Sequence, residues 1–153
     1  MGEISAELVK KIRDETGAGV MDIRRALLES NGDEKAAKEL LKAKGDAAVA
    51  KRSERETAQG VIETYVHSGG KVGAMVLLAC ETDFVAKTDE FKTLARELAM
   101  QVAAMNPTNV DELIDQDYIR DSGKNVKQLV NEVIAKTGEN IQVKRIARFS
   151  LGD

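Results

Sequence analysis

The sequence has little cysteine, few aromatic residues and no long apolar run. Among its 153 residues there is one cysteine and no tryptophan, and aromatic residues make up 3%. A single cysteine excludes an internal disulfide and a metal site built from cysteines, and it fits a reducing compartment. The scarcity of aromatic residues leaves the core to Leu, Val, Ile, Met and Ala. No apolar run approaches the ~20 residues of a membrane-spanning helix, and the beginning of the chain does not resemble a signal peptide. We therefore expect a cytoplasmic protein with no membrane partner.

The chain also has only one histidine, His67, which limits the catalytic arrangements available. A Ser-His-Asp or Cys-His arrangement would need His67 beside a serine or Cys80, whereas the pattern places it at the end of a hairpin. Cys80 ends an apolar strand and is most simply a small buried hydrophobic residue. The glycine-containing stretches at 16–19 and 68–71 lack the context or spacing of phosphate-binding loops. We expect no enzyme activity, no catalytic residue, no cofactor and no metal.

The charge is nearly balanced, with 23 basic and 26 acidic side chains and a net charge of −3. A general nucleic-acid binder would carry an excess of positive charge, so we expect no nucleic-acid partner. Residues 35–55 are a local exception, because seven basic residues there outnumber three acidic ones. A solvated helix face is the commoner explanation of such a stretch, and an acidic protein partner or RNA is the alternative.

Residues 1–45 are predicted to form three short helices. Capping residues, of which Ser5 is the first, and glycines place them at about residues 5–16, 22–30 and 33–45. Three helices with so few large side chains bury little area, so we expect a small docking domain that resembles a ubiquitin-associated domain in fold. Residues 46–58 carry many charges and almost no large apolar side chain, which indicates a connecting helix or linker.

Residues 59–153 have the pattern of an α+β core domain. A β-branched run over 61–67 can turn at Gly69-Gly70 into an apolar strand over 72–79, of the kind that is buried on both faces. Residues 110–121 are predicted as a short helix and a loop. Two amphipathic helices and a last strand are predicted at 88–105, 126–137 and 141–151, and Thr88 can cap the first of these helices. This order predicts a three-stranded antiparallel sheet with helices packed on one face.

The stretch 80–87 joins the apolar strand to the long helix and contains the most unusual residue of the chain. A connection held at both ends by regular structure is stiff, yet it lies at the surface because its backbone groups need water or a partner. Phe84, one of only three phenylalanines, therefore has two explanations. It either folds back onto the helix, as large apolar residues usually do, or stays exposed beside Asp83 for a partner.

Three motifs follow one another along the chain. They are RDETGAGVMD with RRAL at 13–22 and 24–27, CETDFVA at 80–86, and TGENI at 137–141. Together they resemble the signatures of the bacterial elongation factor Ts family, whose members exchange guanine nucleotide on elongation factor Tu. Long members of that family duplicate the core and add a helical insertion, for which this sequence leaves only about twenty residues, between Pro107 and the helix predicted from Val126. The resemblance is therefore to a short form with a single core.

The resemblance implies a guanine nucleotide exchange factor in translation elongation. Its implied partner is elongation factor Tu, in the GDP-bound and nucleotide-free forms. The family loop that corresponds to residues 82–85 is implicated in displacing Mg²⁺ from the partner, and the implied residues are Thr82, Asp83, Phe84 and Val85. The turn between the first two helices is the implied second contact, with Ile12, Thr16, Gly17, Gly19, Val20, Met21 and Asp22.

Two other functions stay open on the sequence, and so does the oligomeric state. An RNA- or ribosome-binding module would use residues 35–55, and binding that weakens steeply with salt would support it. A small cysteine hydrolase would use Cys80 and His67, and thiol-blocked activity on an ester would support it. Neither accounts for three motifs in one order.

Overall fold

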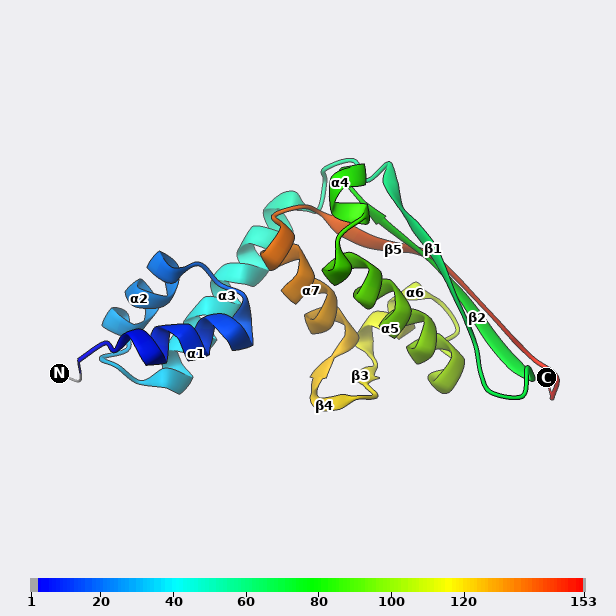
Figure 1. The fold of residues 1–153 in the computed structure, drawn as a ribbon, viewed down its shortest axis with the longest axis horizontal. Coiled ribbons are helices and arrows are strands. Elements are labelled where there is room, and N and C mark those ends of the chain that lie inside the picture. Colours follow the sequence, from blue (N-terminus) through cyan, green and yellow to red (C-terminus); the bar gives the residue numbers. More distant parts are fainter. Residues whose placement is uncertain (1–2, 153) are drawn as a thin grey trace. The chain divides into compact units, whose positions relative to one another are not determined.

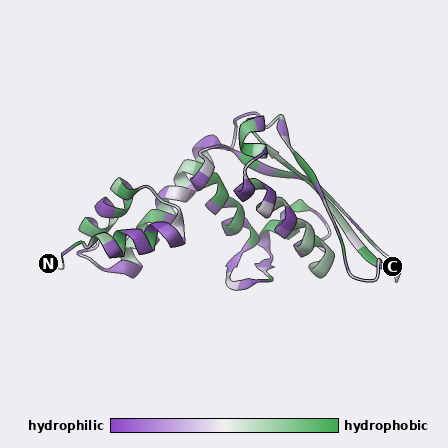
Figure 2. Cartoon of the chain, viewed as in Figure 1, coloured by the Kyte–Doolittle hydropathy of each residue, from purple (hydrophilic) through white to green (hydrophobic). Residues whose placement is uncertain are grey.

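The structure is a computed structural model that describes residues 3–152, and it divides into two compact units (Figure 1). The first unit extends to Arg52 and is entirely helical, and the second begins at Ser53 and combines a sheet with helices. This confirms the predicted α+β class with a helical N-terminal part. The helices of both units carry hydrophobic as well as hydrophilic residues, as amphipathic helices do (Figure 2).

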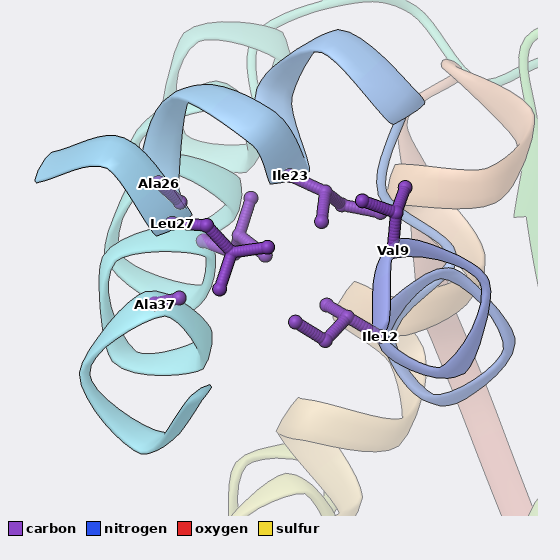
Figure 3. Packing of buried hydrophobic residues seen from close by; sticks show 7 residues of the cluster. Val9, Ile12, Ile23, Ala26, Leu27 and Ala37 are labelled. Carbon is purple, nitrogen blue, oxygen red and sulfur yellow. The ribbon is translucent and has the colours of Figure 1, made fainter. Parts of the chain in front are cut away.

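The first unit consists of three helices around a small core. They are α1 (Ala6–Thr16), α2 (Val20–Glu29) and α3 (Glu34–Arg52). Ser5 caps α1 as predicted, since its Oγ accepts a hydrogen bond from the backbone N–H of Leu8 at 3.1 Å. Figure 3 shows the side chains of all three helices meeting in one cluster of buried residues, which comprises Val9, Ile12, Ile23, Ala26, Leu27, Ala37 and Leu41. None of these is aromatic, in keeping with the composition.

Helix α3 does not end at Gly45, so that part of the prediction is wrong. The helix continues to Arg52 and takes in the first half of the predicted connecting segment. A glycine ends a helix by adopting a positive φ angle, and Gly45 is not among the glycines that do so. Within a helix, glycine costs only about 1 kcal/mol relative to alanine. The alanines and lysines around Gly45 are strong helix formers and outweigh that cost.

The second unit is built on a three-stranded antiparallel sheet, as predicted. Its strands are β1 (Gln59–Val66), β2 (Val72–Cys80) and β5 (Ile141–Ser150), in the order β1-β2-β5. The first two form the expected hairpin, in which Gln59 pairs with Cys80 and Val66 pairs with Gly73. The end of β2 that carries Cys80 leads directly into the stretch 81–88.

Helices α5 (Asp89–Met105), α6 (Val110–Asp115) and α7 (Val126–Thr137) lie on one side of this sheet (Figure 1). Helix α5 begins at its predicted cap, Thr88, whose Oγ1 accepts a hydrogen bond from Phe91 N at 3.3 Å. Fully buried side chains of β2 and α5 form the core of the second unit, among them Val76, Leu78, Phe91, Leu94, Leu98 and Val102.

The other face of the sheet is not covered by any described helix. Exposed apolar side chains stand on it from all three strands, including Ile62, Met75 and Phe149. The expectation that β2 is buried on both faces is therefore wrong for its first half, where Met75 is exposed. A continuous apolar run shows that both faces are hydrophobic, but burial also requires an element to cover each face.

Residues 110–121 contain the predicted helix α6, but the predicted loop belongs to a small hairpin of β3 (Asp117–Tyr118) and β4 (Asp121–Asn125). Gln101, fully buried on α5, holds it by donating to Asp117 O at 3.0 Å and accepting from Ile119 N at 3.0 Å. Tyr118 donates to Glu97 Oε2 at 2.7 Å, and burial together with this bond raises the pKa of Tyr118 to about 12. Strands this short and polar have no periodicity that predicts them.

Candidate functional site

The stretch between β2 and α5 contains a single helical turn, α4 (Asp83–Ala86). Thr82 caps the turn, because its Oγ1 accepts a hydrogen bond from Val85 N at 3.3 Å. Thr88 closes it by donating its hydroxyl to Val85 O at 2.7 Å. The turn is thus fixed at both ends by threonine side chains. We call residues 82–87 the tip.

The tip buries two of its side chains and exposes an aromatic ring. Val85 and Ala86 are 5% and 6% exposed, whereas Phe84 is 79% exposed. Of the two explanations for Phe84, folding back onto the helix is therefore wrong. Asp83 stands beside it with 70% of its side chain exposed, at 3.4 Å from Lys87 Nζ. The tip presents an apolar ring and a carboxylate together, held on a stiff support.

Val85 differs from the other residues that the resemblance implies for this loop. Its side chain faces the interior of the second unit, so it anchors the turn and does not reach a partner directly. Thr82 is exposed, but its hydroxyl is engaged in the cap. The directly accessible groups of the tip are the Phe84 ring and the Asp83 carboxylate.

Cys80 is buried at the end of β2, as predicted, and its thiol donates to Thr82 O at 3.1 Å. Burial raises the pKa of the Cys80 thiol, and the nearby Glu139 carboxylate adds to this effect. His67 follows β1 at the opposite end of the hairpin, where its Nδ1 is 2.9 Å from Tyr65 Oη. Eight residues of strand, on the order of 25 Å, separate the two ends. A Cys80–His67 hydrolase is therefore contradicted.

The turn between α1 and α2 is the second region that the sequence singled out. Gly17 ends α1 with a φ angle of 71°, and Thr16 donates its hydroxyl to Ile12 O at 2.7 Å. Gly19 then caps α2, whose first residues are exposed: Val20 by 39% and Met21 by 70%. The turn thus places two apolar side chains at the surface.

Asp22 lies in the first turn of α2 and is tied to α3. Its Oδ1 is 2.6 Å from Lys44 Nζ and 3.9 Å from Arg25 Nη1. The hydrogen bond from Lys44 holds the pKa of the Asp22 carboxyl below its ordinary value. A pocket of about 290 Å³ lies beside this pair, lined by Asp22, Arg25, Ala26, Glu29, Leu40, Leu41 and Lys44.

Ile12 departs from the expectation of a partner contact. Its side chain is 0% exposed and lies in the core of the first unit (Figure 3). Within this unit Ile12 supports the turn through packing and through its carbonyl, which accepts the Thr16 hydroxyl.

The basic stretch 35–55 is partly neutralised by acidic side chains. Lys38 forms ion pairs with Glu15 and Glu34. Lys44 pairs with Asp22, and Arg55 Nη1 lies 3.5 Å from Glu81 Oε1. At least part of the positive charge therefore serves contacts within the protein, as a solvated and ion-paired surface does.

Within residues 3–152 there is no group of three or more His, Cys, Asp and Glu side chains that could hold a metal ion. Over the same residues, no helix combines the length and the apolar character needed to cross a membrane.

Comparison with known proteins agrees with the motifs. The family model described as elongation factor TS matches residues 81–153, which include the tip. The chain is 40% identical over 198 aligned residues to the elongation factor Ts of Desulfosudis oleivorans, covering 100% of both chains. It is 42% identical over 194 residues to that of Thermotoga maritima, covering 99% of this chain and 98% of the relative. These matches define a translation elongation factor. The chain belongs to the elongation factor Ts family.

The alignments also show that this chain is shorter than its relatives. The 198 aligned positions exceed its 153 residues, so at least 45 of them lie opposite gaps in this chain. The three-helix unit and the α+β unit are both present within that shorter length.

Proposed function

We propose that the chain is a guanine nucleotide exchange factor that binds elongation factor Tu carrying GDP and promotes GDP release. The observation that carries this proposal is the tip, where a 79% exposed phenylalanine stands beside an exposed carboxylate on a capped turn. Family membership supports the choice of partner. The proposal implies a cytoplasmic protein without covalent chemistry of its own.

The mechanism is thermodynamic linkage between two ligands of the partner. A GTPase holds the diphosphate through backbone N–H groups at a helix N-terminus and through Mg²⁺. A factor that binds the nucleotide-free form more tightly than the GDP form must weaken GDP binding by the same ratio. The factor therefore needs a surface that fits the partner only after the phosphate and Mg²⁺ site has been disturbed.

The tip has the properties of such a surface. The Phe84 ring can be buried between elements of the partner, and fully desolvated aromatic side chains are frequent hot spots of binding energy. The Asp83 carboxylate can accept hydrogen bonds from groups that the ring displaces. Thr82 and Val85 fix the turn, so little conformational freedom is lost when the tip binds. Together these four residues would displace Mg²⁺ from the partner.

The turn of the first unit would supply the second contact. Val20 and Met21 would bury their exposed side chains on the partner. Thr16, Gly17 and Gly19 would shape the turn, and Asp22 would hold α2 against α3.

The test is the rate of release of fluorescent GDP from elongation factor Tu after addition of this protein and excess unlabelled GDP. We expect acceleration at substoichiometric amounts and at fixed Mg²⁺. When EDTA removes Mg²⁺ beforehand, the acceleration should shrink, because one of the two groups to be displaced is already gone. Release at the spontaneous rate in the presence of Mg²⁺ would contradict the proposal.

A further inference from the structure

The third motif lies against the tip through one side chain. Glu139 follows α7, and its Oε1 accepts hydrogen bonds from Glu81 N at 3.1 Å and Thr82 N at 3.0 Å. Its Oε2 accepts from the Thr82 hydroxyl at 2.7 Å. All three bonds go to the two residues immediately before α4. One carboxylate therefore receives every hydrogen bond of this group, across 57 or 58 positions of sequence.

The contact is reciprocal. Glu81 Oε1 accepts a hydrogen bond from Asn140 N at 2.9 Å, so each segment offers a carboxylate to the backbone of the other. The Asn140 side chain is 2% exposed and donates to Arg55 O at 2.8 Å, and the Arg55 guanidinium lies 3.5 Å from Glu81. These bonds fix Asn140, the residue next to Glu139.

These bonds begin where the sheet ends. The last pair between β2 and β5 is Cys80 with Ile141, so the next N–H groups, at 81 and 82, have left the ladder. A backbone N–H that has left the ladder needs another acceptor or water. A carboxylate is the stronger kind of acceptor, and here it takes up both groups.

The bonds also set the direction of α4. The Thr82 hydroxyl donates its only hydrogen to Glu139 and accepts from Val85 N with a lone pair. The side chain that caps α4 is therefore oriented by Glu139. Because α4 has one turn, its cap and the burial of Val85 and Ala86 determine where Phe84 points.

We propose that Glu139 is the positioning residue of the tip: its carboxylate holds the backbone and cap of residues 81–82 so that Phe84 and Asp83 are presented for nucleotide release. The proposal rests on the exchange function proposed above. Glu139 acts through the tip and needs no contact of its own with the partner.

Substitution of Glu139 tests this role. Glu139→Ala should slow GDP release about tenfold or more at saturating factor. Glu139→Gln should lie between this variant and the parent, because the amide oxygen can still accept the two backbone N–H groups. Glu112→Ala is the matched control. The Glu112 carboxylate also accepts a hydrogen bond from a backbone N–H just before a helix, that of Thr108 at 3.1 Å, but the helix is α6 and not α4. Glu112→Ala should release GDP at the parental rate.

A double-mutant cycle separates positioning from general stability. If Glu139 acts through the tip, adding Glu139→Ala to Phe84→Ala should slow release clearly less than the tenfold or more that Glu139→Ala costs in the parent. A further tenfold loss in the double variant would overturn the proposal. If the circular dichroism spectrum of Glu139→Ala differs from that of the parent, the cycle is repeated with Glu139→Gln in its place. Fully additive effects of Glu139→Gln and Phe84→Ala on the release rate would also contradict the proposal.

A readout on the free protein does not depend on exchange. The chain has no tryptophan, so Phe84→Trp introduces a single reporter at the tip. Adding Glu139→Ala should lower the time-resolved anisotropy of this tryptophan, whereas Glu112→Ala should not. Unchanged anisotropy would overturn the positioning role even if the protein releases GDP. Lowered anisotropy, together with a parental protein that releases no GDP, would support the positioning role and reject the exchange function.

Discussion

The hydroxyl oxygen of Thr82 accepts a hydrogen bond from the backbone N–H of Val85 at 3.3 Å, and this cap supports the one helical turn on which Phe84 stands. Val85 points inward and Phe84 points outward from the same turn. A ring that is 79% exposed gains little from folding, so folding alone does not explain its position. The stiffness of the turn favours binding, because a backbone that is already fixed loses little freedom at an interface.

Phe84→Ala should leave stability nearly unchanged and impair exchange. The ring is 79% exposed, so truncation removes few contacts within the protein. As an interface hot spot, it should cost on the order of 2 kcal/mol in binding to the nucleotide-free partner, roughly a thirtyfold effect. Chemical denaturation and stopped-flow GDP release measure the two effects in parallel.

Phe91→Ala is the control for that experiment. It removes the same ring from a fully buried site on α5 and should cost about 3–5 kcal/mol of stability. A Phe84→Ala protein that unfolds as early as the Phe91→Ala protein would contradict the exposed position. One that is stable and still releases GDP at the parental rate would move the active surface elsewhere.

Replacing both Val20 and Met21 by serine should raise the dissociation constant for the partner. Both side chains are exposed at the start of α2, so helix content and thermal stability should be retained. Titration calorimetry and circular dichroism check the two parts. Leu28→Ser is a suitable control, because Leu28 is 62% exposed near the other end of the same helix. Equal binding by the parent and the double variant would exclude this turn from the interface.

Local signals were sufficient for much of the fold. Ser5 and Thr88 were recognisable as caps, and the alternation in β1 followed by Gly69-Gly70 predicted the hairpin. Such features depend on a few neighbouring residues, so a single sequence contains them. Phe84 was recognisable as unusual for the same reason, although its exposure needed the structure.

Features that depend on distant residues were missed. Nothing near Glu139 shows that its carboxylate binds the backbone of residues 81–82, more than fifty positions away. The β3–β4 hairpin depends on the buried amide of Gln101, and the bare face of β2 depends on where the helices lie. Sequence patterns indicate which secondary structure a segment can form, whereas these contacts depend on which other segment packs against it.

Two glycines should respond in opposite directions to substitution by alanine. Gly60 has a φ angle of 148°, and a Cβ atom there would lie 2.1 Å from Leu78 O, so Gly60→Ala should destabilise the protein by about 2–4 kcal/mol. A Cβ atom at Gly45 would meet nothing within 4 Å in the middle of α3, so Gly45→Ala should stabilise by about 0.5–1 kcal/mol. Denaturant titration measures both. A destabilising Gly45→Ala would mean that α3 is interrupted near residue 45.

Removal of residues 1–52 should leave a folded protein with weaker partner binding. The cut falls at the end of α3 and keeps Ser53, whose carbonyl accepts a hydrogen bond from Gln142 at 3.1 Å. The remaining part keeps its own core around Phe91 and Leu98, and it keeps the whole tip. It lacks the turn with Val20 and Met21, so more protein should be needed for half-maximal GDP release. The rate at saturation should fall much less, because the tip is intact.

A thermal melt and a titration of the release rate check these expectations. An early, non-cooperative melt would show that the second unit depends on the first for folding. A normal melt with no GDP release at any concentration would show that the first unit takes part in the release step as well as in binding.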